Sequence, residues 1–318
     1  MSGEATPGAP TGLRRQVDGI LLLDKPEGLT SNAALQRIRR AYQARKAGHT
    51  GSLDPLASGL LPVCLGQATK ASGFLLDADK TYEVTIALGE RTETGDREGK
   101  VVERVPVPSL GEAAVRRVAA GFVGELDQVP PMYSALKHEG QRLYRLARRG
   151  VEVERPPRRV VIHRLELLAI DGPRLRFGVR CSKGTYVRTL AEDLARALGT
   201  VGHVASLRRL ALGPFVSPRM HALADVEASA RDLSALDALL LPPDAALAAL
   251  PAVQLGPAEQ ALVLQGQAVF VSGPGGSRAR MYGPGGRFLG VGRMAGEGGR
   301  VAPERIMVDL AGGAAASA

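Results

Sequence analysis

The sequence contains no tryptophan, only two cysteines and few aromatic residues, which make up 4% of its 318 residues. Cys64 and Cys181 lie in separate apolar runs, without a C-x-x-C pair or a Cys/His cluster at zinc spacing. A disulfide framework and a structural zinc are therefore excluded. Residues 20–23 form an apolar stretch far shorter than a signal or membrane segment, and no other run is long enough, so we expect a cytoplasmic protein.

Several common catalytic motifs are also missing. Residues 59–70 contain glycines and end in a lysine, but Gly66 is followed by Gln67, so they do not spell a P-loop. The sequence has no G-x-S-x-G nucleophile elbow and no H-E-x-x-H zinc helix. These absences exclude nucleotide hydrolysis, esterase chemistry and zinc catalysis, and we expect neither a cofactor nor a metal.

Positive charge is the clearest bulk property that is present. The 41 lysines and arginines exceed the 32 acidic residues, which gives a formal net charge of +9 and a pI near 9.9. A composition of 45% hydrophobic and 23% charged residues is typical of a folded chain. Such a charge balance favours a polyanionic partner, with nucleic acid ahead of an anionic membrane surface.

The pattern along the chain predicts four segments. Residues 1–17 lack periodicity and are rich in Gly, Pro, Ala and Thr, which predicts a disordered leader. Residues 18–250 interleave strand and helix patterns, which predicts an α+β domain with a mixed sheet and flanking helices. Residues 251–311 carry short β-like runs and two Gly-Pro-Gly-Gly turns, so we expect a small β-barrel-like module, followed by a tail at 312–318.

Several elements of the large domain have distinct signals. A short buried strand at residues 19–26 precedes a helix that Thr30 or Ser31 can cap. Residues 80–88 alternate as a half-buried strand does. Ser109 and Glu112 form a capping box that predicts a helix start. The remaining expectations are a basic helix at 142–149, three short strands within 160–181 and a helix at 189–198.

Asp54 stands between glycines and before Pro55, and on its own an Asp-Pro pair is a turn former. The complete string at residues 48–59, GHTGSLDPLASG, resembles the catalytic motif of the TruB-type pseudouridine synthases, G-H-x-G-x-L-D-P-x-A-x-G. Further blocks similar to the family lie at residues 19–26, 80–82, 131–137, 181–188 and 207–209. The resemblance runs from about residue 18 to 210, and more loosely through a C-terminal module similar to a PUA-like RNA-binding barrel.

The resemblance implies a pseudouridine-synthase fold and cofactor-free isomerisation of uridine 55, by tRNA convention, in the TΨC arm of tRNA. The reaction breaks the bond from C1′ to N1 and joins C1′ to C5. Asp54 would be the catalytic carboxylate, and it could attack C1′, attack C6 or remove the C2′ proton. Arg188 would supply the cation that keeps a secluded Asp54 ionised.

The resemblance also implies the residues that hold the RNA. Tyr82 would act beside Asp54 and contact the base, Tyr186 and Leu207 would line the pocket, and His49 would fill the space that the flipped base leaves. Extruding a stacked uridine costs a few kcal/mol, which backbone contacts must offset. The candidates for those phosphate contacts are Lys25, Arg39, Arg40, Lys137, Arg142, Arg145 and Arg208.

Three other functions stay open. One is a guide-RNA-dependent synthase of the dyskerin type, although the block at residues 131–137 favours the stand-alone type. Another is an RNA-binding or RNA-folding protein without catalysis. A third, glycosidase-like hydrolysis, requires a second acid at a paired spacing, and none is evident. We expect the TΨC stem-loop of tRNA as the partner, no protein partner and a monomer.

Overall fold

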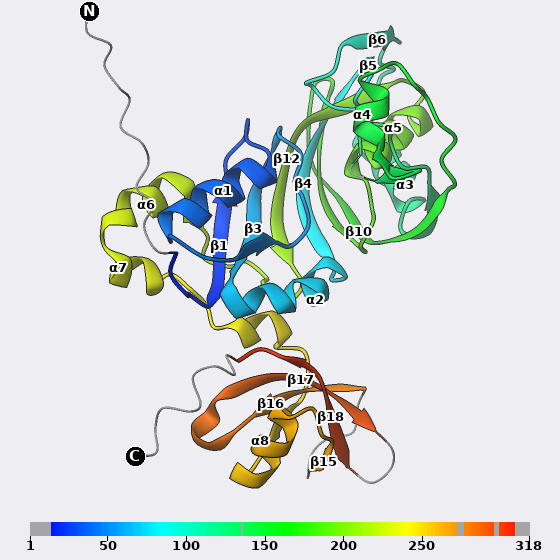
Figure 1. The fold of residues 1–318 in the computed structure, drawn as a ribbon. Helices are drawn as coiled ribbons and strands as arrows, with labels where there is room; N and C mark the ends of the chain where they lie inside the picture. Colours follow the sequence, from blue (N-terminus) through cyan, green and yellow to red (C-terminus); the bar gives the residue numbers. More distant parts are fainter. Residues whose placement is uncertain (1–13, 135, 272–276, 296–298, 309–318) are drawn as a thin grey trace, which may run out of the picture.

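The computed structural model describes residues 14–134, 136–271, 277–295 and 299–308. A large part built on one long sheet stands beside a smaller part formed by the C-terminal end of the chain (Figure 1). The predicted α+β class with a mixed sheet is confirmed. Residues 1–13 of the predicted leader, the tail at 312–318 and the first Gly-Pro-Gly-Gly turn lie outside the described residues.

The large sheet has nine strands in the order β13-β1-β3-β12-β4-β11-β10-β7, with β2 paired to β3. Its strands are β1 Gly19–Lys25, β2 Ala47–His49, β3 Ala57–Leu65, β4 Lys80–Leu88, β7 Gly124–Gln128, β10 Arg158–Asp171, β11 Arg174–Cys181, β12 Gly202–Leu212 and β13 His221–Ala222. Most neighbours are antiparallel, but β12 runs parallel to β3 and β13 runs parallel to β1. The parallel pair β3 and β12 lies at the centre of the sheet.

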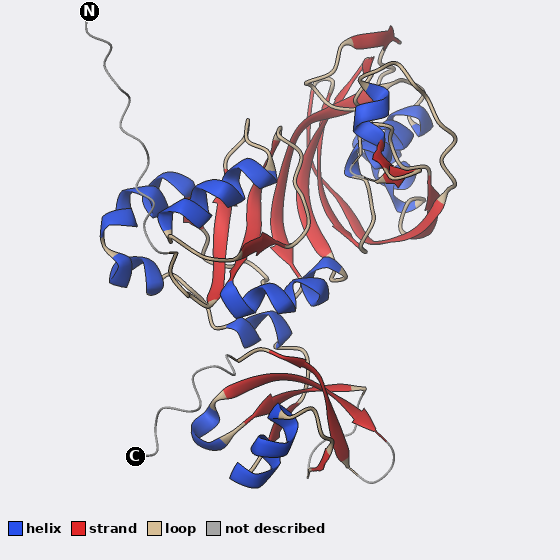
Figure 2. Cartoon of the chain, in the orientation of Figure 1, coloured by secondary structure: helices blue, strands red, loops and turns tan. Residues whose placement is uncertain are grey.

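Helices and short hairpins surround this sheet (Figure 2). The α-helices are α1 Ser31–Ala41, α2 Ser72–Leu76, α3 Glu112–Ala120, α4 Leu143–Ala147, α5 Val187–Ala197, α6 Leu223–Ala228, α7 Leu233–Asp237 and α8 Pro257–Leu264. The 3-10 turns are η1 Gly66–Ala71, η2 Ser229–Arg231, η3 Pro243–Leu247 and η4 Pro284–Gly286. Two hairpins join β5 Glu90–Thr92 to β6 Val101–Arg104, and β8 Lys137–His138 to β9 Gln141–Arg142.

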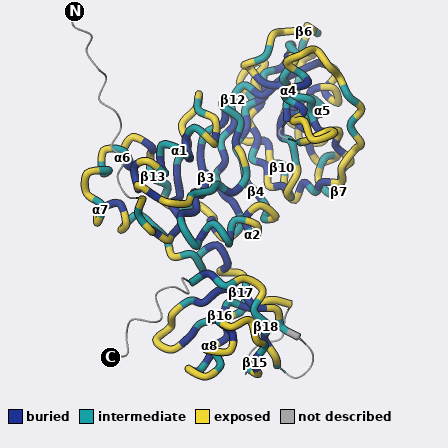
Figure 3. Tube along the Cα trace, in the orientation of Figure 1, coloured by how far each residue is buried: buried dark blue, intermediate teal, exposed yellow. Residues whose placement is uncertain are grey.

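Helix α1 forms where the sequence predicts it. The Thr30 hydroxyl accepts a hydrogen bond from the Ala33 amide at 3.1 Å, which caps the helix. Leu35 and Ile38 on its apolar face are buried in the main core, where each large aliphatic side chain contributes roughly 1.5–3 kcal/mol. Figure 3 shows this buried layer running along the sheet under exposed helix faces. The packing fixes the N-terminus of α1 beside the loop that precedes β3.

The C-terminal module is a curled five-stranded sheet in the order β14-β16-β17-β18-β15, with α8 against it (Figure 1). Its strands are β14 Ala252–Gln254, β15 Val269–Phe270, β16 Arg278–Tyr282, β17 Phe288–Ala295 and β18 Arg300–Ile306. The module has a core of its own, and a second apolar cluster joins its Val291 and Met307 to Leu60 of the large sheet. The Lys70 ammonium donates to the Ile306 carbonyl at 2.8 Å across the same junction.

Some local predictions are wrong. Gly111, not Ser109, is the N-cap of α3, so the predicted capping box is absent. The three strands expected within residues 160–181 are two, because β10 continues for 14 residues through two bulges that interrupt its alternation. The helix expected at 142–149 shrinks to α4, and α8 occupies a segment in which only strands were expected.

The last residues of the predicted leader have a described conformation. The Arg15 amide donates to the Gln43 carbonyl at 2.8 Å, and the Arg45 amide donates to the Arg15 carbonyl at 3.0 Å. Val17 is buried in the main core. Residues 14–17 therefore pair with the segment that follows α1, and the periodicity of so short a segment could not reveal this contact.

Candidate active site

Asp54 lies in the loop between β2 and β3, and the loop is held on several sides. The Ser31 hydroxyl donates to the Leu53 carbonyl at 3.0 Å and accepts from the Leu53 amide at 2.7 Å. The Asp54 carbonyl accepts from the Ala57 amide at 3.0 Å, which closes a turn. The buried Lys25 ammonium donates to the Pro55 carbonyl at 3.4 Å. The backbone that carries the Asp54 carboxylate is therefore fixed in position.

The structure gives a reason for Gly59, the last glycine of the motif at residues 48–59. It has a φ of +96° and pairs with Arg209 of the parallel strand β12. A Cβ at this position would lie 2.3 Å from the Arg209 carbonyl oxygen. Glycine therefore lets β3 and β12 approach, and this approach aligns the Asp54 loop with the residues of β12.

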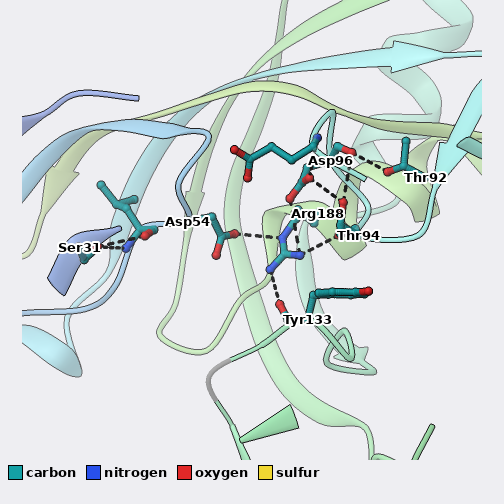
Figure 4. A network of polar contacts seen from close by, with 9 residues as sticks. Ser31, Asp54, Thr92, Thr94, Asp96, Tyr133 and Arg188 are labelled. Atoms are coloured by element: carbon teal, nitrogen blue, oxygen red, sulfur yellow. Dashed lines mark hydrogen bonds and ion pairs between the residues drawn. The ribbon is translucent and has the colours of Figure 1, made fainter. Parts of the chain in front are cut away.

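Arg188, in the first turn of α5, meets the Asp54 carboxylate. Its Nε lies 3.0 Å from Asp54 Oδ2, and its side chain is only 6% exposed. The rest of the guanidinium is held by the carbonyl oxygens of Thr94 and Tyr133, each at 2.7 Å (Figure 4). With its terminal nitrogens engaged in this way, the arginine presents Nε to Asp54 in one orientation.

A second carboxylate, Asp96, stands behind this arginine. Its Oδ2 lies 3.7 Å from Arg188 Nη1, and its Oδ1 accepts from the Thr94 hydroxyl at 2.6 Å and from the Glu98 amide at 3.1 Å (Figure 4). Asp96 is not among the site residues expected from the sequence. No sequence signal separates it from an ordinary turn residue, because its contact with Arg188 exists only in the folded chain.

The groups around Asp54 have opposing effects on the pKa of its carboxyl group. Burial raises the pKa of its carboxyl group and Asp96 adds to this rise, whereas the Arg188 and Lys25 cations lower it. The net direction is upward from the ordinary value of 3.8. Its side chain is still 41% exposed, so the carboxylate opens into a pocket rather than being sealed in protein. Arg188 thus limits, without cancelling, the cost of secluding this charge.

That pocket has a volume of about 280 Å³. It brings together five of the predicted residues, because Asp54, Tyr82, Tyr186, Arg188 and Leu207 all line it. The rest of the lining is Ser52, Leu53, Ser134, Thr185 and Val187. Strand β12 lies between β3 and β4, which places Leu207 between the Asp54 loop and Tyr82. The pocket lining thus combines two tyrosines with the Asp54–Arg188 ion pair.

Tyr186 is positioned by a residue that sequence reasoning missed. Gln128, buried at the end of β7, accepts from the Tyr186 amide at 2.9 Å and donates to the Tyr186 carbonyl at 3.1 Å. This reciprocal pair fixes the residue that caps α5. The start of the helix, and with it Arg188, is tied to the far edge of the sheet.

The other predicted residues lie outside the pocket lining. His49 is half-buried on β2, and its Nδ1 atom has no partner among the described residues. Lys25 is fully buried, and its ammonium also donates to the Pro26 and Leu29 carbonyls, so this lysine does not reach a phosphate in this conformation. Arg208 pairs with Asp24 at 2.7 Å. The exposed candidates are Arg40, Lys137, Arg142 and Arg145, and Arg39 is half-buried.

A wider opening of about 620 Å³ shares Asp54, Ser134 and Arg188 with the pocket and continues past Tyr133 and Tyr144.

In the part of the chain that the structure describes, no group of His, Cys, Asp or Glu side chains is arranged to hold a metal ion. No described helix is long and apolar enough to span a membrane.

Family comparisons match almost the whole described chain. Residues 39–187 match the TruB family pseudouridylate synthase N-terminal domain, residues 188–248 the tRNA pseudouridylate synthase B C-terminal domain, and residues 251–307 the C-terminal domain of pseudouridine synthase II TruB. Among solved structures, a chain of a Cbf5-Nop10-Gar1 complex superposes with a TM-score of 0.72 at 27% identity, covering 91% of this chain and 85% of that one.

Two relatives are each 52% identical to this chain. The tRNA pseudouridine synthase B of Nitrosococcus oceani aligns over 94% of this chain and 97% of its own length. The protein of the same name from Azoarcus sp. strain BH72 aligns over 94% and 98%. Both the sequence identity and the coverage extend through the large sheet and the C-terminal module, so this chain belongs to the TruB family of pseudouridylate synthases.

Proposed function

We propose that this protein isomerises uridine 55 in the TΨC arm of tRNA to pseudouridine, with Asp54 as the catalytic carboxylate. The observation that carries the proposal is the Asp54–Arg188 ion pair, 3.0 Å long, at the floor of a pocket with tyrosines in its walls. The relatives named tRNA pseudouridine synthase B support the tRNA substrate.

The reaction is an isomerisation, so it needs no net gain or loss of atoms. The bond from C1′ to N1 breaks, a bond from C1′ to C5 forms, and the C5 proton leaves while N1 gains one. Asp54 in its ionised form serves any of the three routes, which are attack on C1′, attack on C6 and removal of the C2′ proton. Arg188 holds the carboxylate in its charged form and fixes its direction.

The pocket dimensions suit a single flipped nucleotide. A volume of about 280 Å³ is near the lower limit of small-molecule sites. Tyr82 and Tyr186 would stack against or line the base, and Leu207 would close the remaining wall. We assign to His49, on the neighbouring strand, the role of filling the space from which the base leaves. These side-chain roles are part of the proposal.

The exposed cations around the site would contact the tRNA backbone. Lys137 and Arg142 lie on the β8–β9 hairpin and Arg145 on α4, next to the wider opening beside Asp54. We propose residues 18–250 as the catalytic part and residues 251–311 as an RNA-binding module. The tRNA substrate favours a cytoplasmic monomer that acts without a protein partner.

Release of tritium from tRNA that carries [5-³H]uridine tests the activity, because C5 loses its hydrogen when pseudouridine forms. The wild-type protein should release one equivalent without any added cofactor. Asp54→Asn should bind the tRNA with similar affinity and release at least about a thousandfold less. Asp171→Asn, which changes an exposed carboxylate on β10, is the matched control and should behave as wild type.

The same assay separates the other functions. Full release from the tRNA without an added guide RNA contradicts the guide-RNA-dependent alternative. Tight binding of tRNA with no release by the wild type would support an RNA-binding protein. Free uracil in the reaction would indicate hydrolysis. Undiminished release by Asp54→Asn would exclude the proposed catalyst.

A further inference from the structure

A second pocket, of about 290 Å³, lies at the other end of β3 from Asp54. Four cationic side chains line it, namely Arg15, Arg45, Lys46 and Lys70, and we call it the basic pocket. It shares no residue with the pocket around Asp54. From Ala57 to Leu65 the strand makes eight residue steps. The two ends of β3, near which the two pockets lie, are therefore roughly 26 Å apart.

The backbone around the basic pocket is held in place. The Arg45 amide donates to the Arg15 carbonyl at 3.0 Å, and the Gly66 amide donates to the Lys46 carbonyl at 2.9 Å. Gly66 has a φ of +54°, and a Cβ there would lie 2.0 Å from Asp18 Oδ1. Any other residue at this position would push the segments apart. The pocket is thus a built concavity rather than a chance gap between surface side chains.

Its charge is mostly unneutralised. Arg15 pairs with Asp237 at 2.5 Å, and Lys70 donates to the Ile306 carbonyl at 2.8 Å. Arg45 and Lys46 are exposed, and neither has an ion pair in the described part of the chain. Asp18, the acidic residue in the lining, accepts the Gln67 amide at 2.6 Å. The balance favours an anionic ligand.

Two buried polar atoms at this pocket lack partners. Arg15 Nη1 and the Gln67 side-chain oxygen are buried without a hydrogen bond among the described residues. Leaving such a group unpaired costs about 1–3 kcal/mol, so a bound ligand with several oxygen atoms would gain from the arginine donor. The Gln67 amide can rotate to offer its nitrogen instead. Both residues line the same cavity as the two unpaired cations.

We propose that the basic pocket binds a backbone phosphate of the RNA substrate, at a distance from the uridine that enters the Asp54 pocket. This inference rests on the proposed tRNA substrate. The lining is cationic and offers no aromatic side chain for stacking a base, so it suits phosphate rather than base recognition. Arg39 donates to the Arg45 carbonyl at 3.2 Å, which extends the positive surface along α1.

The test compares two double variants in the binding of unmodified, full-length tRNA. Arg45→Gln with Lys46→Gln removes the two unpaired cations of the basic pocket. Lys100→Gln with Arg117→Gln removes the same charge from exposed positions on β5–β6 and α3, outside both pockets. We expect the first variant to bind at least about fivefold more weakly at low salt, with a salt slope lower by about one to two units. The control should lose less than about twofold.

Phosphate-ethylation interference locates the contact. Ethylation at one or a few phosphates should weaken binding by the wild type and the control, and these positions should lose their effect in the Arg45→Gln, Lys46→Gln variant. Identical interference patterns in all three proteins would overturn the proposal. An equal loss of affinity in both double variants would do the same, since it would reflect net charge alone.

Inorganic phosphate at constant ionic strength distinguishes a small-anion site. If phosphate binds the basic pocket while tRNA affinity is unaffected by the first variant, the pocket serves a free anion and the RNA assignment is wrong. A wild-type protein without isomerase activity would contradict the proposed function, whereas the phosphate contact is judged by binding alone.

Discussion

Opposing neighbours set the charge of Asp54. Burial and Asp96 raise the pKa of its carboxyl group, and Arg188 and Lys25 lower it, with a net upward shift from 3.8. The proposed reaction uses the carboxylate, so activity should be present above this raised pKa and fall as the pH decreases through it. The arginine therefore determines how far toward neutral pH this fall extends.

Replacing Arg188 by glutamine should move the acidic limb of the kcat/KM profile to higher pH, because the largest favourable charge beside Asp54 is gone. At neutral pH we expect a loss of roughly 10²–10³-fold, as for other preorganised electrostatic groups. Tritium release measured across the pH range provides the profile. Arg164→Gln, an exposed arginine of β10, is the control. An unchanged acidic limb would contradict the role of Arg188.

Lys25 should make stability depend on pH in the alkaline range. Burial lowers the pKa of its ammonium from 10.5 to about 8. Between these values the unfolded chain binds more protons than the folded one, so the free energy of unfolding should rise with pH from about 8 to 10.5 by on the order of 2–3 kcal/mol. Urea unfolding across this range measures the rise, which Lys25→Met should remove. A flat profile in the wild type would refute the assignment.

At the scale of elements, the parallel pair β3 and β12 assembles the site. Ala57 of β3 pairs with Leu207, and Gly59 pairs with Arg209. The Arg209 guanidinium is buried and donates to the carbonyls of Leu60 and Gly51, so β12 also braces the loop before Asp54. The register between these two strands thus determines where the carboxylate points.

Gly59→Ala should therefore destabilise the protein by several kcal/mol, because the new Cβ would meet the Arg209 carbonyl at 2.3 Å in a left-handed backbone conformation. Gly178→Ala is the matched control in β11, where the nearest atom would lie at 3.8 Å. Urea denaturation of both variants measures the difference. Equal stability of the two variants would contradict a steric clash between this Cβ and β12.

Sequence patterns predicted those elements that are stabilised by residues close to one another in the sequence. Thr30 caps α1 and an apolar stripe follows it, so the helix could be identified from neighbouring residues alone. The Ser109–Glu112 pattern was misleading because a sequence pattern shows only that capping hydrogen bonds could form. In the structure Gly111 is the N-cap of α3 instead. The length of β10 could not be predicted, since it depends on pairing with β11 and β7, and two register shifts against β11 interrupt its alternation.

The candidate site was predictable only through the family motif. Asp54 and Arg188 are far apart in sequence, and nothing in their local context links a turn aspartate to an arginine at a helix start. Asp96 and Gln128 remained unnoticed because their roles consist entirely of tertiary contacts. The burial of Lys25 was equally hidden, since a lysine at a strand end is usually exposed.

On the scale of the whole molecule, one apolar cluster couples the C-terminal module to the large sheet. Met307 is 3% exposed in this cluster, so Met307→Ala should cost about 2–4 kcal/mol. Because the module also has its own core, we expect the variant to weaken the junction and unfold the two parts at separate temperatures. Calorimetry measures this, with the half-buried Met294→Ala as the control. A single unshifted transition would contradict the coupling.

The two cysteines have a practical consequence. Cys64 and Cys181 are free and buried, and burial raises their thiol pKa values to about 12 and about 11. The native chain thus presents almost no thiolate to a maleimide dye at neutral pH. One cysteine introduced at the exposed Phe270 of β15 would therefore be the sole site of labelling, and a fluorophore there could report in real time how tRNA docks on the module.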